Sequence, residues 1–143
     1  MPGPTGRTTL LIIDDSPDFQ VLIKTYLQGS SLSCLSAADA VQATGIALRL
    51  KPQVILLDIG LPGGDGLMLL DRLRTNVYTS AIPIIVATAR TTLGLESKAR
   101  SKGAVAFLQK PIQKQILLET LQQVLQESVV QQEAMPPLPP IPQ

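Results

Sequence analysis

Short apolar runs alternate with amphipathic stretches along most of this chain. Runs that are apolar at nearly every position are typical of strands buried on both faces of a sheet. Strong runs of this kind occur around residues 8–13, 53–57 and 83–87, and weaker ones occur at 32–36 and 104–109. These five segments are predicted strands.

The stretches between the runs have the spacing of helices with one buried face. The first opens on Ser16, Pro17 and Asp18, a helix-start signal that combines a capping hydroxyl, a proline and an acid. We expect Leu50 and Ile116 to lie on the buried faces of their helices, toward the hydrophobic core. The predicted helices run from Pro17 to just before Gly29, over 39–50, over 65–76, in a polar and marginal segment up to Lys102, and over 112–127.

Five strand–helix units in this order predict an α/β domain with an open five-stranded parallel sheet flanked by five helices. We assign this domain to residues 9–128. Residues 1–8 are a predicted flexible N-terminal arm, and residues 129–143 a Pro-rich C-terminal tail. Segment 135–142, MPPLPPIP, is expected to be extended polyproline II, either as a solvated tail or linker remnant or as a ligand for an aromatic-lined groove.

Composition removes several classes of function. The formal net charge of +1 is too small to indicate direct binding of nucleic acid or of a membrane surface. No apolar run approaches the roughly 18 residues of a membrane span, and the single Cys34 favours a cytoplasmic location. The absence of histidine excludes His-based metal sites and Ser-His or Cys-His nucleophile pairs.

Polar side chains follow the predicted strands at their carboxyl ends. Asp14 and Asp15 follow the first strand, Asp58 the third, Thr88 ends the fourth, and Lys110 follows the fifth. Ligands of such sheets lie outside the carboxyl ends of the strands. Three carboxylates in one cleft repel each other, and Mg²⁺ relieves that repulsion. The pattern therefore predicts a Mg²⁺-binding site, and with Mg²⁺ bound a carboxylate is a competent nucleophile toward phosphorus.

The chain resembles the response-regulator receiver family over about residues 9–127. The resemblance rests on Asp14-Asp15, on Asp58 followed by Leu61-Pro62-Gly63-Gly64-Asp65-Gly66, on Thr88-Ala89, and on Gly103-Ala104, Phe107 and Lys110-Pro111. The intervals also match, with thirty residues from Asp58 to Thr88 and twenty-two from Thr88 to Lys110. The resemblance implies a flavodoxin-like (βα)5 fold.

The resemblance also implies a role for each matching residue. Asp58 is the expected phosphoacceptor. The metal is expected on Asp15, Asp58 and the backbone carbonyl of Gly60, with Asp14 acting mainly through water. Lys110, Thr88 and Ala89 are expected to bind the phosphoryl group, Thr88 and Phe107 to form the switch pair, and the Lys110–Pro111 peptide bond to be cis.

Two residues that flank the site are particular to this chain. Gly60, two residues after Asp58, carries no side chain to shield the acyl phosphate. Arg90, two residues after Thr88, places a long cation near the same opening. We hypothesise that Arg90 folds over the phosphoryl group and that Gly60 leaves room for it.

These features predict a signalling switch and not a conventional enzyme: a stand-alone receiver that catalyses only its own phosphorylation and dephosphorylation. Its expected partners are a sensor histidine kinase and an effector or histidine phosphotransfer protein. The expected oligomeric state is a monomer or a phosphorylation-dependent homodimer. A degenerate docking receiver is an alternative. A haloacid-dehalogenase-type phosphatase would need an Asp in place of Gly60, and a dinucleotide-binding module a phosphate-cradling loop in place of Asp14-Asp15-Ser16.

Overall fold

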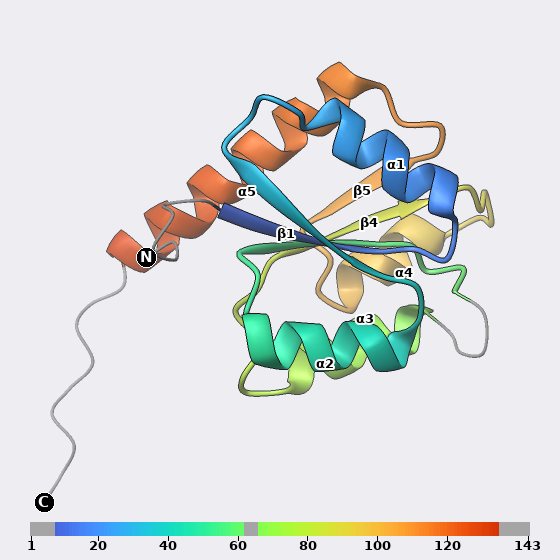
Figure 1. The fold of residues 1–143 in the computed structure, drawn as a ribbon. Helices are drawn as coiled ribbons and strands as arrows, with labels where there is room; N and C mark the ends of the chain where they lie inside the picture. The colour runs from blue at the N-terminus through green and yellow to red at the C-terminus, as the bar shows by residue number, and fades with distance from the viewer. Residues whose placement is uncertain (1–7, 62–65, 135–143) are drawn as a thin grey trace, which may run out of the picture.

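The computed structural model describes residues 8–61 and 66–134, with side chains as far as Ser128. Five strands and five helices alternate through these residues (Figure 1). The strands are β1 (Thr8–Ile13), β2 (Leu32–Ala37), β3 (Val54–Leu57), β4 (Ile84–Thr88) and β5 (Ala106–Gln109). The helices are α1 (Pro17–Tyr26), α2 (Ala40–Leu50), α3 (Gly66–Thr75), α4 (Leu95–Ser101) and α5 (Lys114–Ala134).

The strands form one parallel sheet in the order β2-β1-β3-β4-β5. Neighbours pair in register, for example Ile13 with Leu57 between β1 and β3, and Leu57 with Val86 between β3 and β4. The chain leaves β1 for β2 on one side and returns to β3 on the other. The strand order therefore reverses between β1 and β3, and the crevice beyond their carboxyl ends is the expected ligand position of such a sheet.

The sheet has a hydrophobic core on each face. Helices α2, α3 and α4 cover one face of the sheet, and α1 and α5 cover the other (Figure 1). Leu11, Ile55 and Val86 belong to the core under α2, α3 and α4, whereas Leu10, Leu56 and Ile85 belong to the core under α1 and α5. Every residue of β3 is buried because both faces are covered. This double burial explains why the central strands are apolar at nearly every position.

Local sequence signals account for several helix boundaries. The Ser16 hydroxyl caps α1 by accepting the amide of Phe19, and Asp39 caps α2 through the amide of Gln42. Pro17 occupies the first turn of α1, where its missing N–H costs nothing. The predicted five-unit architecture and the predicted starts of both helices are therefore confirmed.

Three helix details differ from the predictions. Leu50 and Ile116, expected in the core, are exposed by 57% and 43%. Leu50 is the last residue of α2, where the helix leaves the sheet, and Leu117 occupies the buried position of α5 beside Ile116. Helix α5 continues to Ala134, beyond the expected end at 127 and across the expected domain boundary after 128.

Two predicted segments lie outside the described residues. They are residues 1–7 of the N-terminal arm, which precede β1, and the Pro-rich segment 135–142. The same holds for Pro62-Gly63-Gly64-Asp65 in the loop before α3.

Candidate functional site

Three aspartates converge at the point where the strand order reverses. Asp14 and Asp15 follow β1, and Asp58 follows β3, the strand paired directly with β1. One carboxylate oxygen from each residue lies within 4.8 Å of the others. Asp14 is buried, Asp58 is partly buried and Asp15 is exposed, so the cluster runs from the protein interior to the surface.

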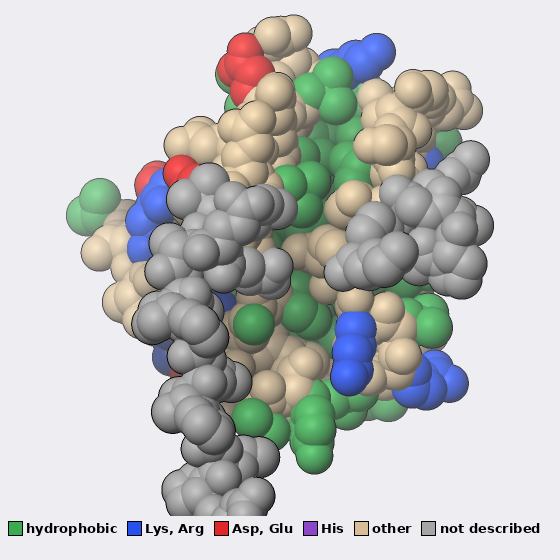
Figure 2. Space-filling view, turned by 90° about the vertical axis from the view of Figure 1, so that its left-hand side faces the viewer, with side chains coloured by type: hydrophobic (Ala, Val, Ile, Leu, Met, Phe, Trp, Pro, Cys, Tyr) green, Lys and Arg blue, Asp and Glu red, His purple; other side chains and the backbone are tan. Residues whose placement is uncertain are grey.

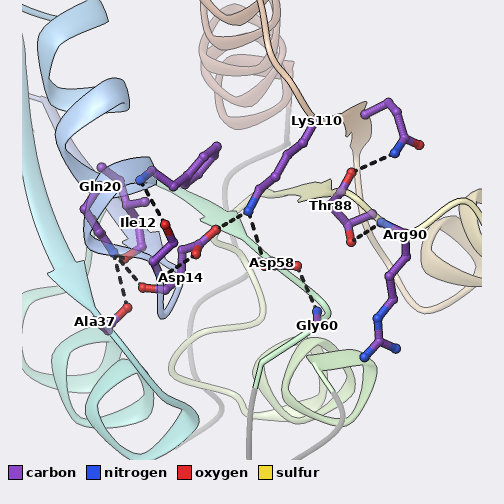
Figure 3. A network of polar contacts seen from close by, with 12 residues as sticks. Ile12, Asp14, Gln20, Ala37, Asp58, Gly60, Thr88, Arg90 and Lys110 are labelled. Atoms are coloured by element: carbon purple, nitrogen blue, oxygen red, sulfur yellow. Dashed lines mark hydrogen bonds and ion pairs between the residues drawn. The ribbon is translucent and has the colours of Figure 1, made fainter.

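Lys110 is the cation of this cluster. Its Nζ lies 2.5 Å from Asp14 Oδ2 and 3.3 Å from Asp58 Oδ2 (Figure 3). The side chain of Asp14 is only 1% exposed, and a buried carboxylate requires such a partner. Lys110 therefore neutralises part of the repulsion between two of the three carboxylates.

Backbone and side-chain amides fix the loop that carries Asp14. Asp14 Oδ1 accepts the amide N–H of Ser16 at 2.9 Å. From α1, the buried Gln20 donates its Nε2 to three backbone carbonyls, those of Ile12, Asp14 and Ala37, at 3.0–3.3 Å (Figure 3). This side chain thus joins the carboxyl ends of β1 and β2 directly beneath the acidic loop.

One carboxylate oxygen of Asp58 faces Lys110, and the other faces the backbone of the loop that follows β3. Its Oδ1 accepts the amide N–H of Gly60 at 2.8 Å. The Arg90 side chain reaches the same place: a Cβ added to Gly60 would lie 3.3 Å from Arg90 Nε and 3.3 Å from Asp58 Oδ1. The structure therefore brings together the two residues that the sequence singled out as flanks.

Thr88 ends β4 beside this crevice. Its side chain is buried, and its hydroxyl accepts the amide N–H of Arg90 at 3.2 Å (Figure 3). Its carbonyl accepts N–H groups from Lys110 at 2.8 Å and from the Gln109 side chain at 3.0 Å, which ties the end of β4 to that of β5. Ala89 is exposed at the opening.

Phe107 and Pro111 complete the predicted set. Phe107 lies in β5 opposite Val86 and packs, partly buried, against the core that faces α2, α3 and α4. Strand β4 separates it from β3, the strand that Asp58 follows. The Lys110–Pro111 peptide bond is cis, as expected.

Two residues of this site were missed at the sequence level. The ring of Phe19 lies 4.0 Å from Lys110 Nζ, a cation–π contact that helps to hold the lysine over the aspartates. In the sequence, Phe19 is one of the apolar residues that follow Pro17 at the start of α1, and nothing there indicates a contact with Lys110. Gln20 gave a weak signal, an uncharged polar side chain beside that face, but its contacts to carbonyls at the ends of both β1 and β2 depend on how α1 lies over the sheet.

One titratable group outside the crevice has a shifted pKa. Burial raises the pKa of the Cys34 thiol on β2, and the nearby charge of Lys24 acts in the opposite direction. Among the described residues, no helix has both the length and the apolar character needed to cross a membrane.

Comparisons with known proteins agree with this geometry. A model of the response regulator receiver domain matches residues 10–122. Protein PilH of Pseudomonas aeruginosa is 32% identical over 116 residues, which are 81% of this chain and 96% of PilH. The phosphate regulon transcriptional regulatory protein PhoB of the same organism is 33% identical, but the chain spans only about half of it (52%).

The solved structures agree as well. The signal receiver domain of a Luxo repressor protein from Vibrio parahaemolyticus superimposes with a TM-score of 0.84 at 27% identity, covering 92% of this chain and 99% of that domain. Aspartate phosphorylation and Mg²⁺ binding are typical of the family to which these matches point, and its members are not conventional enzymes. The chain belongs to the response regulator receiver domain family and functions in two-component phosphorelay signalling.

Proposed function

We propose that Asp58 accepts the phosphoryl group. The observation that carries this assignment is the position of its carboxylate, which is partly accessible and also within 3.3 Å of Lys110 Nζ. Asp14 also contacts Lys110, but its side chain is 1% exposed. Asp15 is exposed, and it has no hydrogen bond or ion pair within the part of the chain that the structure describes. Asp58 alone combines access with a neighbouring cation.

The donor atoms fit Mg²⁺. The cluster offers only carboxylate oxygens, and Mg²⁺ prefers oxygen ligands at about 2.0–2.1 Å with several waters retained. Asp15 and Asp58, with the carbonyl of Gly60, would hold the ion directly. Asp14 already accepts bonds from Lys110 and from the amide of Ser16, which supports a role for it through water. The ion would supply positive charge that offsets the carboxylates and the phosphoryl oxygens.

The transfer requires no base from this chain, because the nucleophile is an ionised carboxylate. An Asp58 oxygen attacks phosphorus, the new P–O bond forms, and the P–N bond of a kinase phosphohistidine breaks. The imidazole leaves with the electron pair and takes a proton. In dephosphorylation, a water oxygen attacks phosphorus and Asp58 leaves as carboxylate.

The surrounding residues would respond to the negative charge of the phosphoryl group on Asp58. Lys110 would pair with a phosphoryl oxygen, and the Thr88 hydroxyl and the exposed Ala89 amide lie at the edge of the same crevice. Thr88 now holds the amide of Arg90, so its movement toward the phosphoryl group would release that amide. Phe107, only partly buried, would turn into the space that Thr88 vacates. The changed surface would then bind an effector.

The partners follow from this chemistry. A sensor histidine kinase would supply the phosphoryl group, and an effector or a histidine phosphotransfer protein would receive the signal or the group itself. The complete set of three carboxylates with Lys110 disfavours a degenerate docking receiver. A cytoplasmic location is compatible with the single reduced cysteine.

Intact-mass measurement after incubation with acetyl phosphate and Mg²⁺ tests the proposal. We expect the mass of one added phosphoryl group, lost in Asp58→Asn and without Mg²⁺. Asp18→Asn, which removes an exposed acid from the first turn of α1, is the matched control and should retain the shift. An unchanged mass for the wild-type protein, or an equal shift in Asp58→Asn, would overturn the assignment.

A further inference from the structure

A buried side-chain amide lies beneath the loop that carries Asp14 and Asp15. It belongs to Gln20, which is only 9% exposed and lies in the first turn of α1. Its Nε2 donates to three backbone carbonyls, those of Ile12 at 3.0 Å, Asp14 at 3.2 Å and Ala37 at 3.3 Å (Figure 3). The nitrogen carries only two hydrogens, so at least one of them is shared between two acceptors.

The surroundings of Gln20 settle the orientation of its amide. With the amide reversed, its oxygen would face three carbonyl oxygens with no hydrogen between them. In the observed orientation, Gln20 Oε1 has no hydrogen-bond partner among the residues that the structure describes. Buried polar atoms usually have such a partner, and an unpaired one calls for an explanation. The hydrogen bonds of this side chain therefore all go to the three carbonyls, and its role must be sought there.

The bond to the Asp14 carbonyl bears directly on Asp15. That carbonyl and the N–H of Asp15 belong to one planar peptide unit, so a donor that holds the carbonyl also fixes the plane from which Asp15 extends. On the other side of Asp14, its own N–H donates to the Ala37 carbonyl at 3.0 Å. Asp15 itself has no hydrogen bond or ion pair within the described part of the chain. The position of its carboxylate therefore depends on the peptide that Gln20 holds.

We propose that Gln20 is a positioning residue for the metal: by fixing the Asp14–Asp15 peptide, it holds the Asp15 carboxylate where that group, with Asp58, would bind Mg²⁺. This inference rests on the role of Asp15 in the proposed function. Side chains that orient a metal ligand typically contribute 10- to 100-fold in metal affinity. Gln20 holds the peptide and not the carboxylate itself, so we expect the lower end of this range, about tenfold.

NMR on the full 143-residue protein tests this role, with and without Mg²⁺. Gln20→Met keeps the length of the side chain and removes both donors. In the Mg²⁺-free variant, the ¹⁵N order parameter of the Asp15 amide should fall from about 0.85, typical of rigid backbone, to below about 0.6. A Mg²⁺ titration of the same sample should give a Kd about tenfold above that of the wild-type protein. At saturating Mg²⁺, the rate of phosphorylation by acetyl phosphate should return to the wild-type value, because Asp58 and Lys110 are unchanged.

Two control variants separate positioning from general effects. Gln122→Met makes the same chemical change at an exposed residue of α5, beside an apolar groove that Thr8 and Leu32 line at the amino ends of their strands. Figure 2 shows this end of the molecule, with hydrophobic side chains in a hollow between polar ones, whereas the aspartates follow the carboxyl ends of the strands. Ile23→Val trims a fully buried side chain in the next turn of α1, so it lowers stability without changing the three carbonyl contacts. Both controls should keep the wild-type Asp15 order parameter and Mg²⁺ Kd.

Three outcomes would overturn the proposal. A wild-type order parameter and Kd in Gln20→Met would show that the amide only braces the fold, and an equal rise of Kd in Ile23→Val would show that affinity follows stability. A rate that stays low at saturating Mg²⁺ would place the effect on Asp58. Gln20→Asn, which shortens the side chain by one methylene group, replaces Gln20→Met if that variant does not fold. The order parameter and the Kd require no phosphoryl transfer, so this inference and the assignment of Asp58 can fail separately.

Discussion

Gly60 and Arg90 share the opening of the acidic crevice, where a Cβ on residue 60 would crowd Arg90 Nε at 3.3 Å. Arg90 is exposed, and its side chain has no hydrogen bond or ion pair to other residues that the structure describes, so it is free to contact a phosphoryl group on Asp58. A contact of this kind is worth about 0.2–1 kcal/mol, which corresponds to about a 1.4- to fivefold change in rate.

We therefore expect Arg90→Ala to shorten the lifetime of phosphorylated Asp58 by about two- to fivefold, because water then reaches the phosphorus more easily. The decay of the phosphorylated mass with time measures this lifetime. Arg49→Ala removes an exposed arginine of α2 and serves as the control. An Arg90→Ala lifetime equal to that of the control would disprove shielding by Arg90.

Gly66 and Gly45 are both helical glycines with opposite surroundings. A Cβ on Gly66 would lie 2.2 Å from the Cα of Ile59, in the loop that follows Asp58, whereas on Gly45 it would meet only the end of Arg49 at 3.8 Å. We expect Gly45→Ala to stabilise the protein by about 0.5–1 kcal/mol. Gly66→Ala must displace backbone and should destabilise by more than about 2 kcal/mol.

Urea unfolding followed by far-UV circular dichroism measures both changes. The pair controls for helix propensity, because alanine replaces glycine in both variants. If Gly66→Ala were as stable as Gly45→Ala, the close approach of α3 to the Asp58 loop would be wrong. A Gly66→Ala protein that folds should also take up less phosphoryl group, since Ile59 adjoins Asp58.

At the scale of elements, α4 is the least anchored helix among those described. It has seven residues, only Ala99 is buried, and Gly94 at its N-terminus provides no side-chain cap. In contrast, α1 and α2 carry capping side chains, and α5 buries Leu117, Leu121 and Val124. Few buried contacts and an uncapped end lower the free energy of local opening.

Native-state hydrogen exchange should therefore find the amides of α4 the least protected of the five helices. We expect residues 98–101 to exchange at least tenfold faster than residues 117–124 of α5, which corresponds to about 1.4 kcal/mol. Exchange read by NMR at fixed pH provides the comparison. Equal protection of the two segments would show that α4 opens only together with the whole domain.

The sequence predicted elements better than it predicted their exposed ends. The strands followed from continuous apolar runs, because both faces of the sheet are covered. Leu50 and Ile116 were misplaced because periodicity alone does not show where a helix leaves the sheet. The extra turns of α5 were missed because they project past the sheet (Figure 1), so no core pattern marks them.

The candidate site, too, was predictable from the sequence only in part. Asp14, Asp15, Asp58, Thr88 and Lys110 were predictable because parallel strands end at one edge of a sheet. The support from Phe19 and Gln20 was not predictable, since it depends on how α1 lies over Lys110 and over the ends of β1 and β2. Residues at strand ends follow from topology, whereas their supporting contacts require coordinates.

At the scale of the whole molecule, the acidic crevice concentrates negative charge that a bound cation would offset. Three aspartates and Lys110 give a formal charge of −3 + 1 = −2 in one small volume. A divalent ion that binds only the folded protein balances this charge and stabilises the fold by RT ln(1 + [L]/Kd). At tenfold excess over Kd, the gain is about 1.4 kcal/mol.

We therefore expect Mg²⁺ at tenfold above its Kd to raise Tm by about 4–7 °C for a domain of this size. Asp15→Asn should abolish the shift, because Asp15 is the carboxylate that is free to bind the ion directly. Asp18→Asn, an exposed acid three residues further on, should retain it. Thermal unfolding at constant ionic strength, with NaCl replacing MgCl₂ in the reference, separates binding from screening. An equal rise in NaCl would show that the crevice is merely screened, and an undiminished rise in Asp15→Asn would place the ion elsewhere.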